Sequence, residues 1–135
     1  MATSSSRLFK HIKSTFNFEN YLHISNKSFR NALTKVRLSS HSFFIERGRW
    51  AKNKIEIKDR TCTLCGSVED EFHCIVECPR FKTERKGLLP ENLLTKPSMY
   101  DFVNLFKCVD IKKCEKLGLL CFKILRSYEK TYLTD

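Results

Sequence analysis

Three cysteines and one histidine lie close together in the chain, at Cys62, Cys65, His73 and Cys78. Their spacing, C-x2-C-x7-H-x4-C, supplies thiolate sulfur and imidazole nitrogen, which Zn²⁺ prefers in tetrahedral protein sites. Two cysteines separated by two residues form a turn that directs both sulfur atoms toward one ion. The spacing therefore predicts one zinc site. Because four protein ligands fill its shell, the zinc is expected to be structural rather than catalytic.

Cys74 directly follows His73 and is an alternative fourth ligand. Adjacent side chains point about 100° apart on a helix, so both cannot easily reach the same ion. Spacing alone leaves this choice open.

Positive charge is concentrated before the cysteine cluster. The chain has a formal net charge of +10, and residues 1–60 hold 13 Lys and Arg against 4 Asp and Glu, which is +9 of that total. Such a segment suits contact with a polyanion, because Lys and Arg displace counterions from phosphate backbones. The alternatives are a solubilising surface or a face that acidic neighbours cover in a larger protein. The expected nucleic-acid contacts are basic residues beside one aromatic residue: Arg47, Arg49, Trp50, Lys52, Lys54 and Arg60.

Helical periodicity dominates the rest of the sequence. Apolar residues at helical spacing predict helices over about 7–18, 27–38, 98–107 and 110–132, with two further helices near 69–78 and 81–89. The expected fold is mainly α, a small helical domain with an embedded zinc finger whose ligands are two cysteines, a histidine and a third cysteine. We divide it into an N-terminal segment (1–25), a basic helix and connector (26–60), the finger and following helix (61–90), and a C-terminal helical region (91–135).

Composition bears on the cellular compartment. Seven cysteines, an odd number, and the absence of an apolar signal-like start predict an intracellular protein, nuclear or cytoplasmic, that is not secreted. Cys108, Cys114 and Cys121 lie in apolar surroundings and are expected to be buried thiols. The apolar runs are too short to span a bilayer, so no membrane contact is expected. His41 is expected to be an exposed loop residue.

The ligand pattern resembles the zinc-binding region that follows the polymerase in non-LTR (LINE-type) retrotransposon reverse transcriptases. The shared features are the pair Cys62 and Cys65, then Glu69 before His73, then Cys78 followed by Pro79. The upstream block Arg37–Trp50 and Arg60 also resemble the residues that precede such fingers. The resemblance favours His73 over Cys74 as the fourth ligand.

This resemblance implies a module that binds nucleic acid, either RNA template or target DNA, beside a reverse transcriptase or another retroelement protein. No Tyr/Phe-x-Asp-Asp pair occurs in the chain, so the carboxylates of a polymerase are missing and no enzyme activity is expected. Two alternatives stay open. The chain is a structural or protein-interaction domain that docks on a polymerase or other partner, or it is a non-functional retroelement fragment.

Overall fold

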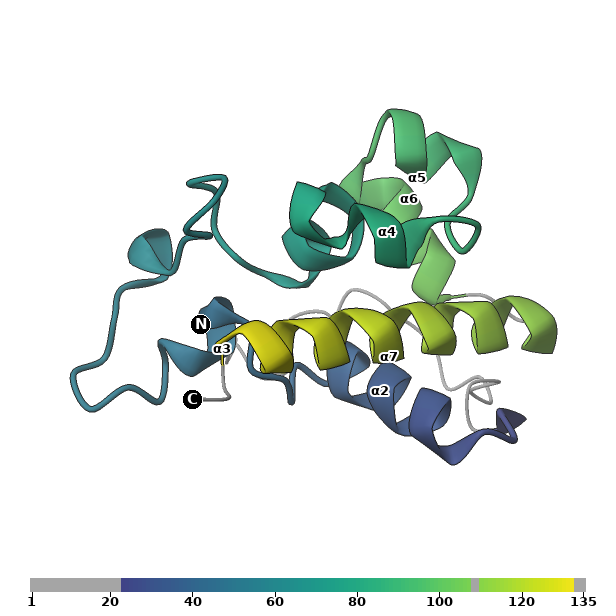
Figure 1. Ribbon diagram of the computed structural model, residues 1–135, viewed down its shortest axis with the longest axis horizontal. Helices are drawn as coiled ribbons and strands as arrows, with labels where there is room; N and C mark the ends of the chain where they lie inside the picture. Colours follow the sequence, from purple (N-terminus) through teal and green to yellow (C-terminus); the bar gives the residue numbers. More distant parts are fainter. Residues whose placement is uncertain (1–22, 108–109, 133–135) are drawn as a thin grey trace.

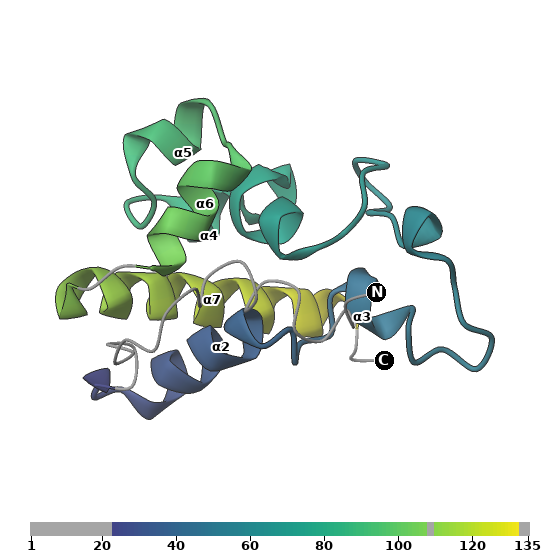
Figure 2. The ribbon, with the colours of Figure 1, turned by 180° about the vertical axis from the view of Figure 1, so that it is seen from behind.

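The computed structural model describes residues 23–107 and 110–132, and within these ranges it is helical without named strands (Figure 1). The expected mainly α fold is therefore confirmed. The expected helix over 7–18 lies outside the described residues. Figures 1 and 2 show the long helix α7 (Ile111–Tyr132) crossing the molecule, with α2 (Lys27–Arg37) along one side and α4, α5 and α6 on the other.

Helix α2 begins and packs as its sequence predicts. The Asn26 side chain accepts a hydrogen bond from the Phe29 amide, 3.1 Å away, and so caps the helix. Ala32, Leu33 and Val36 are buried against α7. Gly118 of α7 allows this close approach, because a Cβ there would lie 3.0 Å from the Phe29 carbonyl oxygen. The two helices therefore form a tightly fitted pair.

Helix α7 supplies the centre of the core. Its apolar residues at helical spacing form a stripe that is buried at all its positions, which are Leu117, Leu120, Cys121, Ile124, Leu125 and Tyr128. Cys114 and Cys121 are buried thiols, as expected, whereas Cys108 lies outside the described residues. One hydrophobic cluster extends from Ile24 to Tyr128, so the segments divided by sequence share a common core.

The second layer consists of short helices, and here the expected boundaries were less accurate. The helix expected over 81–89 is reduced to η5 (Pro79–Phe81) and α4 (Lys82–Arg85). Between the helices expected near 81–89 and over 98–107, the chain forms a further helix, α5 (Glu91–Thr95), which buries Leu93. The expected helix after Ser98 is α6 (Met99–Phe106), where the Ser98 hydroxyl accepts from the Asp101 amide.

Three further short elements precede or overlap the cysteine cluster in the chain. Residues 44–47, for which no helix was expected, form α3 (Phe44–Arg47), and a 3₁₀ turn, η3, covers Ile57–Asp59. The helix expected near 69–78 contains a π-helical turn, η4 (His73–Glu77). Between α3 and η3 the chain extends away from the helices in both views (Figures 1 and 2). None of the described helices has the length and hydropathy of a membrane span.

Candidate metal centre

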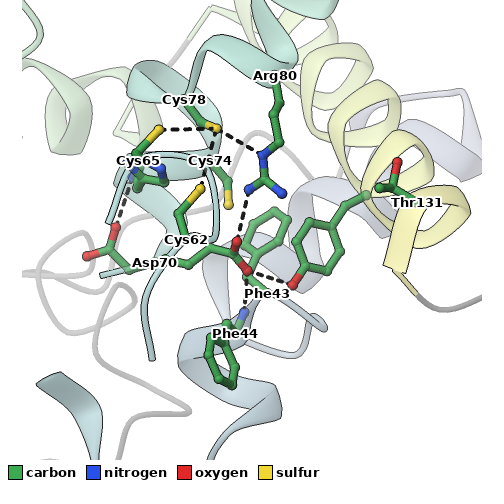
Figure 3. Close-up of polar contacts among 12 residues, drawn as sticks. Phe43, Phe44, Cys62, Cys65, Asp70, Cys74, Cys78, Arg80 and Thr131 are labelled. Carbon is green, nitrogen blue, oxygen red and sulfur yellow. Dashed lines mark hydrogen bonds and ion pairs between the residues drawn. The ribbon is translucent and has the colours of Figure 1, made fainter. Parts of the chain in front are cut away.

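The four predicted ligand residues come together in the structure. One ligand atom from each of Cys62, Cys65, His73 and Cys78 lies within 4.8 Å of every other, so this group can hold one metal ion. The Cys62 and Cys65 sulfurs are each 3.9 Å from the Cys78 sulfur (Figure 3). Two sulfurs bound tetrahedrally at about 2.3 Å from zinc are separated by about 3.8 Å. The distances among the sulfurs therefore match a zinc shell.

A tight turn positions the first cysteine pair. The Gly66 amide donates to the Cys62 carbonyl at 2.8 Å, and the Cys62 amide donates to the Ser67 carbonyl at 2.7 Å. Gly66 has φ of 77°, a left-handed conformation that glycine adopts without steric cost. The turn thus brings the two sulfurs to the same side of the loop.

The π-helical turn positions the second pair. In an α-helix, side chains five residues apart point about 140° away from each other. Here the Cys78 amide donates to the His73 carbonyl at 2.7 Å, an i to i+5 bond that closes a wider turn. The wider turn lets His73 and Cys78 face the same point, and Pro79 ends it.

His73 has the hydrogen-bonding pattern of a metal ligand. Its Nδ1 lies 3.2 Å from the Glu77 carboxylate, which orients the ring. Its Nε2 is buried and has no hydrogen-bond partner among the described residues. A buried polar nitrogen without a partner is costly, and a metal ion held together with the three nearby sulfurs would supply that partner. Imidazole held by a carboxylate on one nitrogen and metal on the other is a common arrangement at zinc.

The structure selects His73 rather than Cys74. Cys74 is fully buried and lies outside the ligand group. Burial, and to a lesser extent the charge of Glu69, raises the pKa of the Cys74 thiol well above its ordinary value. Cys74 therefore packs as a neutral side chain beside the site.

The pKa values of two of the ligand thiols are shifted in opposite directions. Partial burial and the neighbouring sulfurs of Cys62 and Cys78 raise the pKa of Cys65 to about 12. Burial also opposes ionisation of Cys78, but hydrogen bonds and charge from Arg80 outweigh it and lower the pKa of this thiol. A bound divalent ion would supply the remaining charge that holds all three as thiolates.

Arg80 connects the ligand group to a buried carboxylate that spacing did not reveal. Its Nε–H donates to the Cys78 sulfur at 3.1 Å, and its Nη2–H donates to Glu69 at 2.9 Å (Figure 3). Glu69 also accepts from the Tyr128 hydroxyl at 2.6 Å and from the Phe44 amide at 2.8 Å. The Glu69 carboxylate is thus the centre of a hydrogen-bond network that joins the ligand residues to α3 and α7.

His41 corrects another expectation. It is 3% exposed instead of lying in an open loop, and its Nε2 contacts the Glu71 carboxylate. The Phe43 amide donates to His41 Nδ1, and the Ser39 hydroxyl donates to the same Glu71 oxygen. Ser39 is itself fully buried, so this cluster fixes the chain between α2 and α3.

Four of the six predicted nucleic-acid contacts lie in a loop of residues 49–54, here called the arm loop. The Ile55 amide donates to the Gly48 carbonyl at 3.1 Å and closes its base. Lys52 and Lys54 are exposed, and Trp50 is 59% exposed. Arg49 is partly exposed and pairs with the buried Glu46 at 3.2 Å.

The other two predicted contacts lie outside the arm loop and bond within the protein. Arg60 is 1% exposed and donates to the carbonyls of Ile45 and Ile55 at 2.7 and 2.8 Å. These two bonds link α3 to the base of the arm loop. A guanidinium held in this way is not available to a phosphate, which corrects the expectation for Arg60. Arg47 is partly exposed, donates to the Tyr128 hydroxyl at 2.7 Å and lies over the Phe44 ring.

Some functional residues carried no local signal. Arg85 was not among the expected site residues, yet it is buried and donates to the Cys74 and Ile75 carbonyls of the π-helical turn.

Comparisons with protein-family models, curated proteins and solved structures found no match to this chain. The site is therefore interpreted from its own residues.

Proposed function

We propose that the chain is a zinc-stabilised, non-catalytic module that binds nucleic acid, RNA or DNA, through the arm loop. The observation that supports zinc is the partnerless Nε2 of His73 among three cysteine sulfurs in the described part of the chain. Zinc with three sulfurs and one nitrogen has a full shell, so water has no open position on it. Its contribution is to hold the turn at Cys62 and the π-helical turn in one structure.

The arm loop supports the nucleic-acid part of the proposal. Residues 49–54 contain Arg49, Lys52 and Lys54 and no acidic residue, and they surround an exposed Trp50. Lysines contact phosphates, while an exposed indole stacks on unpaired bases. The resemblance to the zinc-binding region of LINE-type reverse transcriptases favours the same role, with RNA template or target DNA as ligand.

Titration of the zinc-loaded full chain with labelled single-stranded RNA and duplex DNA tests this proposal. Anisotropy is measured over a series of salt concentrations. Each phosphate contact contributes about 0.7–0.9 to the slope of log affinity against log salt, so Lys52→Ala with Lys54→Ala should reduce the slope by about 1.5. Trp50→Ala should weaken single-strand binding by about 1–3 kcal/mol and leave the slope unchanged.

The matched control removes the same charge elsewhere. Lys112 and Lys123 are exposed on α7, and their double alanine variant should change the slope much less. Absence of binding at low salt would remove the nucleic-acid proposal. Equal losses in both double variants would remove the arm loop as the binding surface.

A second candidate function is protein docking, for example on a reverse transcriptase. Leu94, Met99 and Tyr100 of α5 and α6 are 45%, 50% and 76% exposed. Large apolar side chains grouped at a surface favour contact with another protein. This surface is separate from the ligand residues and from the arm loop.

A further inference from the structure

A partly open cleft of about 460 Å³ lies between the first turns of α7 and the segment that comprises the α4–α5 connection, α5 and α6. Leu88, Leu105 and Leu117 are among the side chains that line it, together with the buried Leu89 and Leu93. Its volume falls within the range of roughly 300–1,000 Å³ that is typical of binding clefts. Its leucine-lined part is thus apolar and can accept aliphatic side chains.

The two helical walls of the cleft carry different charges. On α7, Lys113 and Lys116 precede Leu117 on one face, with one turn between the two exposed lysines. On α6, Asp101 and Asn104 precede Leu105 in the same i, i+3, i+4 pattern. The α7 wall is therefore cationic, whereas the α6 wall carries one acidic and one neutral polar side chain.

We propose that this cleft binds an amphipathic helical segment of a partner protein that presents leucine-type side chains and acidic residues. Two acidic residues one turn apart on the segment would face Lys113 and Lys116, while the aliphatic side chains enter the cleft. Asp101 on the opposite wall disfavours a segment that is acidic on both flanks and so fixes its orientation. This binding goes beyond nucleic-acid contact and uses a different surface.

The exposed apolar residues next to the cleft extend the same surface. Leu94 belongs to α5, which adjoins the cleft through Leu93, and Met99 begins α6. A helix lying in the cleft can cover part of this apolar area in addition to the leucine-lined floor.

Selection from a random peptide display library on the zinc-loaded full chain tests the proposal. We expect enrichment of peptides that combine Leu, Ile or Phe at helical spacing with Asp or Glu. Binding of the synthesised peptides should weaken at least about tenfold on a Lys113→Glu, Lys116→Glu variant. Both lysines are exposed, so the variant should keep the circular dichroism spectrum of the parent.

Two comparisons make the result specific. The control Lys112→Glu, Lys123→Glu changes the same charge on α7 outside the cleft and should retain peptide affinity. Peptides with their acidic residues changed to Lys should regain binding to the charge-reversed variant. The proposal is overturned if no peptide is enriched, or if enriched peptides bind both double variants equally. It is also overturned if charge reversal at Lys113 and Lys116 weakens RNA binding but not peptide binding. Peptide binding that occurs only in a chain lacking residues 1–22 would overturn it as well.

Discussion

At the scale of single residues, the site depends on what surrounds the four ligands. Arg80 contacts the Cys78 sulfur and the buried Glu69 at the same time, and Glu77 orients His73. Hydrogen bonds to a thiolate and to the far nitrogen of an imidazole fix ligand geometry and tune metal affinity. Arg80 is therefore as much a part of the site as a ligand, although it does not reach the metal position.

Replacing Arg80 with methionine should weaken zinc binding by about 10-fold to 100-fold. The change removes the donor to Cys78 and leaves the Glu69 carboxylate without its cationic partner. Zinc affinity is measured by competition with a chromogenic chelator at neutral pH. Arg126→Met on α7 is the control, because Arg126 is exposed and contacts the Phe122 ring instead of the site. Equal affinity in the two variants would contradict the role assigned to Arg80.

At the scale of elements, two packing relationships position the site. The π-helical turn orients His73 and Cys78, and Arg85 satisfies two of its carbonyls. The α2–α7 pair provides the support, since Tyr128 near the end of α7 donates to Glu69. A change in the distance between α2 and α7 is therefore expected to reduce stability without touching a ligand.

Gly118→Ala tests this packing. The added Cβ would lie 3.0 Å from the Phe29 carbonyl oxygen and 3.1 Å from the Phe29 Cβ, so α2 must shift. Overpacking costs about 1–3 kcal/mol, while alanine gains about 1 kcal/mol over glycine in a helix. We expect a net loss of about 1 kcal/mol in the free energy of unfolding, measured in urea. Lys123→Ala, exposed on the same helix, should be nearly neutral. A Gly118→Ala protein as stable as its parent would refute the tight α2–α7 fit.

Sequence predicted the features that depend on local spacing. Helices α2, α6 and α7 follow from apolar periodicity, and the four ligands follow from their spacing. Features that depend on tertiary contact were missed. Arg60 has the composition of a phosphate contact, but its burial depends on the carbonyls of Ile45 and Ile55. His41 is buried only because Glu71 lies beside it.

At the scale of the whole molecule, the candidate zinc centre and the helical core form one structure. Cys62, Cys74 and Cys78 belong to the same hydrophobic cluster as the α7 stripe. The network from Cys78 through Arg80 and Glu69 to Tyr128 joins them by hydrogen bonds. Metal binding free energy at such a site contributes directly to folding. The arm loop and the cleft are then two surfaces of one scaffold, and the candidate zinc centre is part of its core.

X-ray absorption at the zinc edge of the purified full chain tests the central claim most directly, because it identifies and counts the ligand atoms. We predict one zinc per chain with three sulfurs at about 2.3 Å and one nitrogen at about 2.0 Å. Cys74→Ala should leave this spectrum unchanged, whereas His73→Ala should lose the nitrogen. A folded chain without zinc, or a zinc bound by four sulfurs, would contradict the assignment of Cys62, Cys65, His73 and Cys78.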